Sequence, residues 1–267
     1  MAEVCGKLAN GPFRIAKIRC HDAAGFPSAP GGWTFGGHVF MTAIDEEMRP
    51  AREAMAREVA RLMAELAPRL NHKALSDRVL RVLADVPRHL FVPPDRMSEA
   101  YLNRPVPIGY GQTISQPFIV ALMTDLLDIG PDDRVLEIGT GCGYQTAILA
   151  GLARSVFTIE LCRPLAERAA KTFEAIGLTN VTTRVGDGYL GWPEEAPFDA
   201  IVVTAAPPSI PDALLDQLKP GGRLVVPVGD RSQQLILVEK RRDQSTILRE
   251  IIPVCFVPLT RRDDRPG

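Results

Sequence analysis

The second half of the chain alternates between short apolar runs and stretches with helical periodicity. The apolar runs predict strands at residues 135–138, 156–159, 181–185, 200–204, 224–228, 235–238 and about 247–254. Helical stretches between them cover about residues 144–153, 164–176 and 211–218. Near-continuous runs of Val, Ile and Leu that are joined by helices are typical of a parallel sheet covered on both faces. We therefore predict an α/β fold with a doubly wound, mostly parallel sheet and helices on both faces.

Two helices are expected before this α/β part. Apolar residues spaced four, three and four apart place one helix at about residues 50–66, with an apolar face formed by Met55, Val59, Leu62 and Leu66. A second helix follows Ser76, which suits an N-cap, and ends before Pro87. These helices form an N-terminal helical portion of the predicted domain.

A loop is expected between these helices and the α/β part. Residues 89–117 are rich in Pro and Gly, a composition that is typical of an ordered loop without regular elements. The loop leads into a helix at about residues 118–128, where Pro117 suits the first turn and Ser115 or Gln116 lies at or just before the cap. Residue type alone favours a capping role for Ser115.

A Gly- and Pro-rich segment occupies the N-terminus. Because it lacks apolar periodicity, we expect residues 1–48 to be a flexible extension. The remaining chain is divided into helices and loop at 49–117, an α/β core with C-terminal strands at 118–262, which completes a domain over 49–262, and a tail at 263–267. The change in composition raises the hypothesis that translation begins at Met41 or Met48. An intact mass that matches all 267 residues would contradict it.

Composition narrows the classes of partner and location. The 267 residues include 31 Lys and Arg against 32 Asp and Glu, and this balance provides no long-range field to attract a polyanion such as nucleic acid. The longest near-continuous apolar run, residues 147–153, is about a third of the length that crosses a bilayer. The N-terminus has neither a basic start nor a following apolar block. We expect a cytoplasmic protein that binds neither nucleic acid nor membrane.

Cysteine and histidine limit the chemistry further. The five cysteines are widely separated and form no C-x-x-C pair, so we interpret them as reduced thiols and expect no metal site. The last of the four histidines is His89. No residue after it can act as a histidine base.

The loop after the first predicted strand carries three glycines in the pattern E-x-G-x-G-x-G: Gly139, Gly141 and Gly143. Tyr144 occupies the position where a dinucleotide fingerprint needs its third glycine, so that interpretation fails. Glycines let the backbone approach a ligand closely, and the following helix offers backbone donors. With Glu137 inside the strand, the loop suits a ligand that has a positive charge and an amino-acid moiety, as S-adenosylmethionine does.

Acidic residues also follow the next two predicted strands. Glu160 lies where it can accept hydrogen bonds from both hydroxyls of a ribose, and Asp187, flanked by glycines that include Gly188, can accept from an adenine amino group. An isolated acid at a strand end is more often a solvated loop residue. Because open α/β sheets bind ligands at successive strand ends, the three acids together predict an S-adenosylmethionine site.

Four sequence words resemble the protein-L-isoaspartate O-methyltransferase family: PIGYGQTISQP at 107–117, VLEIGTGCGYQTA at 135–147, PFDAIVVTAA at 197–206 and FVPL at 256–259. The resemblance covers about residues 49–262. It implies a Rossmann-like, S-adenosylmethionine-dependent methyltransferase fold. Cys142 departs from the family, which usually has Ser there, and we interpret the change as conservative in size.

The resemblance also implies an activity and site residues. Members of the family transfer a methyl group from S-adenosyl-L-methionine to the free α-carboxylate of L-isoaspartyl residues in damaged proteins, which initiates repair. An ionised carboxylate needs no general base. This agrees with the absence of any histidine after His89. The family's pattern implies that Ser115 is catalytic and substrate-binding, that Thr113 and Ile114 border the cofactor, and that Val257 and Pro258 help to form the peptide groove. A buried terminal strand is an equal alternative for that last segment. We expect a monomer with isoaspartyl peptides and proteins as partners.

Two other functions stay open from the sequence. A methyltransferase that acts on a small molecule or nucleic acid would share the cofactor fold, but the N-P-P-[YF] motif of enzymes that methylate nitrogen is missing after strand 200–204. A non-catalytic protein that only binds isoaspartyl ends is the second alternative. It would have no need for the acids of a cofactor site, which this chain retains.

Overall fold

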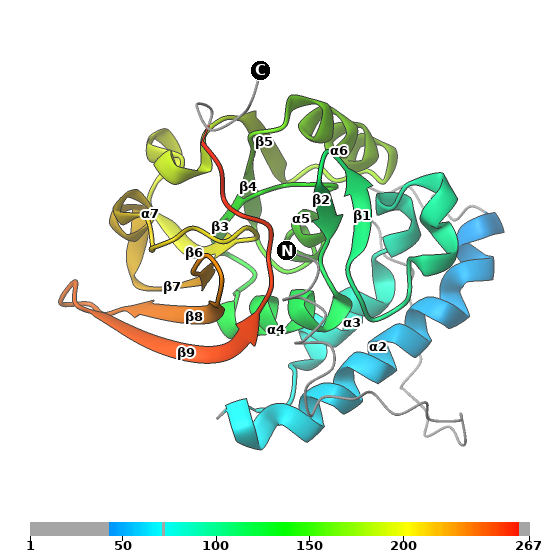
Figure 1. Ribbon diagram of the computed structural model, residues 1–267, viewed down its shortest axis with the longest axis horizontal. Helices are drawn as coiled ribbons and strands as arrows, with labels where there is room; N and C mark the ends of the chain where they lie inside the picture. Colours follow the sequence, from blue (N-terminus) through cyan, green and yellow to red (C-terminus); the bar gives the residue numbers. More distant parts are fainter. Residues whose placement is uncertain (1–42, 71–72, 262–267) are drawn as a thin grey trace. The chain divides into compact units, whose positions relative to one another are not determined.

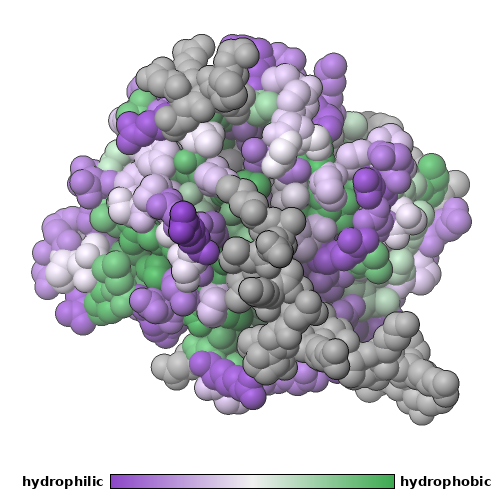
Figure 2. Space-filling model, in the orientation of Figure 1, coloured by the Kyte–Doolittle hydropathy of each residue, from purple (hydrophilic) through white to green (hydrophobic). Residues whose placement is uncertain are grey.

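The computed structural model describes residues 43–70 and 73–261 (Figure 1). Met41, most of the predicted extension and the predicted tail lie outside the described residues. Polar side chains cover much of the described surface seen in Figure 2, with hydrophobic patches between them. No helix in the described ranges is both long and apolar enough to cross a membrane.

A seven-stranded sheet forms the centre of the described part, in the order β5-β4-β3-β6-β7-β8-β9 (Figure 1). Its strands are β3 (Arg134–Ile138), β4 (Ser155–Glu160), β5 (Val181–Val185), β6 (Phe198–Val203), β7 (Leu218–Val228), β8 (Gln233–Lys240) and β9 (Thr246–Val254). The pairs among β5, β4, β3, β6 and β7 are parallel, whereas β8 and β9 are added antiparallel. The mostly parallel sheet is therefore confirmed. The chain leaves β3 in one direction and returns to its other side at β6, which creates a switch point where open sheets bind ligands.

The two faces of the sheet carry two hydrophobic cores. Val135 and Val202 pack on the side of α4 (Pro117–Leu127), α5 (Tyr144–Ala150) and α6 (Arg163–Ala175). Leu136 and Val203 face the opposite side, where α7 (Asp212–Gln217) and the 3-10 turns η3 (Gly188–Leu190) and η4 (Pro193–Glu195) lie. Successive side chains of a strand point to opposite faces. The near-continuous apolar runs thus serve both cores.

The first N-terminal helix is longer than predicted at both ends. The first, α2 (Ala43–Leu70), begins before Pro50 and runs across the boundary expected at residue 48. The spacing of apolar residues, which placed the start at about residue 50, does not include the polar residues of the first turns. There, Asp45 forms a salt bridge with Arg52 at 2.5 Å. The second helix, α3 (Asp77–Asp85), is capped as predicted by Ser76, whose Oγ accepts a hydrogen bond from the amide of Val79.

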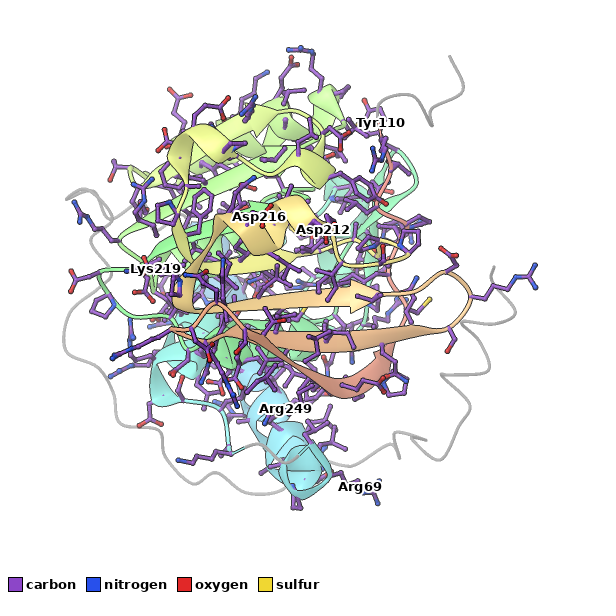
Figure 3. All side chains as sticks on the ribbon, turned by 90° about the vertical axis from the view of Figure 1, so that its left-hand side faces the viewer. Arg69, Tyr110, Asp212, Asp216, Lys219 and Arg249 are labelled. Atoms are coloured by element: carbon purple, nitrogen blue, oxygen red, sulfur yellow. The ribbon has the colours of Figure 1, made fainter. Side chains whose placement is uncertain are left out.

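The loop expected at residues 89–117 contains more structure than predicted. It includes the turns η1 (Arg88–Phe91) and η2 (Pro94–Glu99) and a hairpin of β1 (Val106–Gly109) and β2 (Gln112–Ile114). The expectation of a loop without regular elements is wrong here because Gly109, Tyr110 and Gly111 all adopt positive φ angles and reverse the chain. Tyr110 lies exposed at the tip (Figure 3).

Candidate functional site

A cavity lies at the carboxyl ends of β3, β4 and β6, where the sheet has its switch point. The hairpin, the turn after β5 and a segment after β9 complete its wall. The lining residues are Gln112, Thr113, Ile138, Gly139, Gly141, Ile159, Glu160, Leu161, Gly188, Thr204, Ala205, Val257, Pro258, Leu259 and Thr260.

The glycine loop is bonded to both neighbouring strands. The amides of Gly139 and Thr140 donate to the carbonyl of Ile159 at 2.8 and 3.2 Å, and the hydroxyl of Thr204 donates to the carbonyl of Gly139 at 2.6 Å. The φ angle of Gly139 is +95°, and a Cβ there would overlap the Thr204 side chain. Only glycine fits this position without strain. The bare backbone therefore forms part of the cavity wall.

Glu160 connects the end of β4 to the glycine loop. One carboxylate oxygen accepts the amide of Gly141 at 2.8 Å, and the other accepts the amide of Cys162 at 2.7 Å. Each carboxylate oxygen has about two acceptor directions, so both can still receive a ligand hydroxyl. The side chain is 8% exposed and lines the cavity.

Glu137 lies behind the loop and does not line the cavity. It is fully buried, and one of its oxygens accepts hydrogen bonds from Thr146 at 2.5 Å and Thr158 at 2.6 Å. Its other oxygen has no hydrogen-bond partner among the described residues. Burial raises the pKa of Glu137 to about 8, against the opposing effect of the two threonine hydroxyls. The carboxyl group is therefore protonated at neutral pH in this structure.

The raised pKa of Glu137 makes stability depend on pH. Between the ordinary value of 4.5 and about 8, the folded protein holds a proton that the unfolded chain has released, so the free energy of unfolding falls as pH rises. Glu137→Gln removes this titration. We expect the stability of the variant relative to wild type to increase by on the order of 4 kcal/mol from pH 4.5 to pH 8. Denaturant unfolding at several pH values measures it, and parallel curves for the two proteins would show that Glu137 is ionised in the fold.

The turn after β5 presents a glycine to the cavity. Asp187 accepts the amide of Tyr189 at 2.9 Å and caps η3, and Gly188 lines the cavity beside it. A Cβ on Gly188 would overlap the side chain of Ile138. The backbone therefore approaches β3 as closely as sterics allow, and the Asp187 side chain is half-buried next to the cavity.

Ser115 lies between β2 and α4, next to Thr113 of the cavity wall. Its side chain is half-buried, and its carbonyl accepts a hydrogen bond from Arg88 at 2.8 Å. The N-cap of α4 is Gln116, whose side chain makes no capping bond. The side chain of Asn103 accepts the amide of Phe118 instead, at 3.0 Å. A capping role for Ser115 is therefore wrong, and its hydroxyl is available for other partners.

The segment after β9 crosses the carboxyl end of β6 (Figure 1, red). Ala206 donates its amide to the carbonyl of Val257 and accepts the amide of Leu259, both at 2.8 Å. The side chain of Gln233 accepts the amide of Phe256 at 2.6 Å and donates to the carbonyl of Phe256 at 3.0 Å. The segment forms an isolated parallel bridge between Ala206 and Pro258 and no longer strand. The alternative of a buried terminal strand is therefore wrong, and Val257 and Pro258 line the cavity.

The structure brings most predicted site residues to this cavity. Its wall includes Thr113, Gly139, Gly141, Glu160, Gly188, Val257 and Pro258. The predicted residues that lie beside or behind the wall are Ile114, Ser115, Glu137, Gly143 and Asp187. Sequence reasoning missed Gln112, Thr204 and Thr260. Thr204 follows β6, so the rule that ligands bind at strand ends would have found it.

The Cys142 thiol, which departs from the family pattern, is buried under the loop. Burial raises its pKa to about 11, so it is not a reactive thiolate at neutral pH. The described residues contain no group of three or more His, Cys, Asp or Glu that could hold a metal ion.

A second cavity, of about 800 Å³, lies between α2, α3, α4 and the strands β7 to β9. Two of its cations have partners within the fold: Arg78 donates to the carbonyls of Ile129 and Leu152, and Arg223 forms salt bridges with Asp128 and Glu239. The described residues that line it include neither the glycine loop nor the carboxyl end of a parallel strand. We therefore place the functional site at the cavity beside the glycine loop.

The fold and site together define a class of protein. The Rossmann-like, S-adenosylmethionine-dependent methyltransferase fold has three features that this chain shares. They are a mostly parallel sheet whose strand order reverses at β3, a glycine loop after β3 and an acidic residue at the end of β4. Comparison with known proteins identifies the family within it. Residues 58–264 match the profile described as protein-L-isoaspartate(D-aspartate) O-methyltransferase. The chain belongs to this family.

Individual relatives agree with this assignment. Protein-L-isoaspartate O-methyltransferase 1 of Cupriavidus necator is 53% identical over 221 residues, which cover 82% of this chain and 85% of the relative. Protein-L-isoaspartate O-methyltransferase 2 of Syntrophobacter fumaroxidans is 55% identical over 220 residues, with coverages of 82% and 89%.

Solved structures share the fold. One protein-L-isoaspartate O-methyltransferase superposes with a TM-score of 0.69 at 28% identity, covering 78% of this chain and 65% of that chain. A Plasmodium falciparum structure described as a putative protein-L-isoaspartate O-methyltransferase in complex with S-adenosyl-L-homocysteine has a TM-score of 0.65 at 24% identity, covering 79% and 99%.

Proposed function

We propose that this protein transfers a methyl group from S-adenosyl-L-methionine to the free α-carboxylate of L-isoaspartyl residues in damaged proteins. The observation that carries the proposal is the position of the Ser115 loop, residues 115–116 between β2 and α4, beside a cavity that is built from the glycine loop and Glu160. The methyl ester formed in this way closes to a succinimide when the backbone amide nitrogen of the following residue displaces methanol, which begins the repair of the residue. Membership of the family supports the same activity.

The residues of the cavity suit S-adenosylmethionine. Glu160 would accept hydrogen bonds from the ribose hydroxyls, the loop with Gly139 and Gly141 would border the methionine part, and Asp187 beside Gly188 would accept from the adenine amino group. A Cβ on Gly188 would overlap Ile138, so this part of the proposed cofactor site is formed by backbone without a side chain. Thr113 and Ile114 would border the cofactor from the hairpin. When bound, the cofactor supplies a methyl group on a positively charged sulfur.

The chain contributes orientation and exclusion of water to the transfer. An α-carboxylate is ionised at neutral pH, so the nucleophile needs no proton acceptor. Ser115 would donate a hydrogen bond to this carboxylate and orient one oxygen for in-line attack, while Val257 and Pro258 would hold the peptide and exclude water. Ser115 would not act as a covalent nucleophile, because its hydroxyl forms no hydrogen bond with a base among the described residues.

The decisive assay compares two peptides that differ only at one linkage. Purified protein is incubated with labelled S-adenosylmethionine and either an isoaspartyl peptide or its normal aspartyl isomer. We expect label in the isoaspartyl peptide alone, released by mild base as a methyl ester would be. Equal labelling of both peptides would favour a methyltransferase of other specificity. Binding of the isoaspartyl peptide without transfer would favour a non-catalytic binding protein.

Replacing Ser115 tests the role of its hydroxyl. We expect Ser115→Ala to lower kcat/KM for the isoaspartyl peptide by about 10-fold, because one hydrogen bond to a charged group is lost, while the Kd of S-adenosyl-L-homocysteine stays unchanged. Initial rates and calorimetry measure the two quantities. Ser98→Ala, at an exposed serine of η2, is the matched control. Wild-type activity of Ser115→Ala would remove Ser115 from the active site.

Further expectations accompany this function. Isoaspartyl peptides and proteins would be the partners, and we expect neither nucleic acid nor membrane to bind. A monomeric state and a cytoplasmic location stay predictions from the sequence. Size-exclusion chromatography with light scattering tests the first of these two, and fractionation of cells tests the second.

A further inference from the structure

Arg88 is a fully buried cation directly behind the Ser115 loop. Its Nε donates to the carbonyl of Ala100 at 2.7 Å, and its Nη2 donates to the carbonyl of Ser115 at 2.8 Å. No Asp or Glu of the described residues forms a salt bridge with it, and its Nη1 has no hydrogen-bond partner among them. The guanidinium is therefore held by backbone carbonyls and not by an opposite charge.

A buried charge without a counter-ion is costly, so its presence in this core needs a reason. Desolvation lowers the pKa of Arg88, although a guanidinium remains protonated in proteins. An apolar side chain of similar volume would avoid this cost. However, an apolar side chain cannot donate hydrogen bonds to two carbonyls of two segments at once. The planar fork of arginine does so.

Arg88 also contacts the helix that follows the glycine loop. Its Cζ lies 4.7 Å from the ring centroid of Tyr144, which is the first residue of α5 and 1% exposed. The Tyr144 ring packs edge-on against Phe91, with 5.6 Å between ring centroids. One guanidinium thus contacts both the Ser115 loop and the start of the helix after Gly143. These segments belong to the two halves of the proposed site, for substrate and for cofactor.

We propose that Arg88 is a positioning residue for methyl transfer, which fixes the backbone of Ser115 relative to the glycine loop. The proposal rests on the function proposed above. Arg88 does not line the cavity. It acts through the carbonyl of Ser115 and through Tyr144, so its loss affects the alignment of the two substrates more than the binding of either one.

Arg88→Lys tests this role, because one ammonium group on a flexible stem cannot reproduce the two bonds of the fork. We expect kcat for the isoaspartyl peptide to fall by about 20-fold, with a change of less than about threefold in the Kd of S-adenosyl-L-homocysteine. The kcat of Arg88→Ala should be lower still. It should rise by at least about fivefold when methylguanidinium is added, as a positioning role requires. Methylguanidinium should not raise the activity of Ser115→Ala.

The chain offers a matched control in Arg78. This guanidinium also bonds two carbonyls, those of Ile129 and Leu152, at 2.8 and 2.9 Å, but it lines the second cavity and not the proposed site. Arg78→Lys should lower the melting temperature and leave kcat of the folded protein unchanged. A kcat of Arg88→Lys within about twofold of wild type, or an equal loss of kcat in Arg78→Lys, would overturn the proposal.

Hydrogen exchange separates this proposal from the proposed function. In the absence of any substrate, the amides of residues 112–118 should exchange faster in Arg88→Lys than in wild type, and those of α6 should not. Unchanged exchange at residues 112–118 would overturn the positioning role. Unfolding of both Arg88 variants at the assay temperature would also overturn it, since Arg88 would then serve general stability. Failure of wild-type protein to label isoaspartyl peptides would instead refute the proposed function.

Discussion

Replacement of Glu160 with alanine is expected to reduce kcat/KM for S-adenosylmethionine by about 100- to 1,000-fold. The carboxylate accepts two backbone amides, those of Gly141 and Cys162, in addition to the proposed ribose hydroxyls. Each of these bonds involves a charged acceptor, and removing the acceptor also leaves the Gly141 amide without its partner. Both the shape of the glycine loop and the affinity for the cofactor should therefore be lost.

Calorimetry with S-adenosyl-L-homocysteine, together with initial rates, measures this effect. Glu174→Ala, at an exposed position of α6, is the control for removal of one negative charge and should match wild type. Thermal unfolding of Glu160→Ala shows whether the fold is retained. Unchanged affinity of a folded Glu160→Ala protein would contradict the placement of the ribose at the end of β4.

Gly143→Ala is expected to lower the free energy of unfolding by about 3 kcal/mol. Gly143 is the N-cap of α5 and has a φ angle of +92°, which is strained for a residue with a Cβ. The added Cβ would also overlap the ring of Phe173 and lie 3.4 Å from the Cβ of Ala169. Because α6 is packed in the core, the overlap can be relieved only if this helix shifts.

Two further variants divide this cost into its parts. Gly221 has a φ angle of +88°, and apart from this glycine and its two chain neighbours no heavy atom of the described residues lies within 4 Å of the position that a Cβ would occupy there. Gly221→Ala should therefore cost only about 1 kcal/mol, the backbone strain alone. In a Phe173→Leu background, the cost of Gly143→Ala should fall by about 1 kcal/mol or more, because the overlapping ring is gone. Denaturant unfolding measures these costs, and equal values for Gly143→Ala and Gly221→Ala would show that contact with α6 is unimportant.

The parallel part of the fold follows from local patterns in the sequence. Runs rich in Val, Ile and Leu correctly predicted β3, β4 and β6, because a strand buried on both faces needs apolar residues at most positions. The prediction of β5 is also correct, although this strand lies at the edge of the sheet and its residues are mostly exposed. The hairpin β1–β2 was missed because Pro105 and Pro107 disfavour strands. The backbone at Tyr110 adopts a left-handed conformation that its residue type does not indicate.

The candidate site was predicted to the extent that it consists of glycines and acids at strand ends. Gly139, Gly141 and Glu160 line the cavity as the pattern indicates. Glu137 belongs to the same pattern but is buried behind the loop, bonded to Thr146 and Thr158. Periodicity identifies a residue inside a strand, but the direction of its side chain relative to the ligand depends on the packing of the helix that follows.

By itself, the sequence determined the strands of the parallel sheet, the glycine loop and the acids that follow β4 and β5, because residue type and spacing control these features locally. Only the tertiary structure decided the order of β7, β8 and β9, the crossing of Val257 over the end of β6 and the burial of Arg88 against Ser115. Arg88 and Ser115 are 27 residues apart, and Ala206 and Val257 are also distant in sequence. Such contacts form only when the whole sheet has assembled, since the apolar cores on its two faces hold these segments in place.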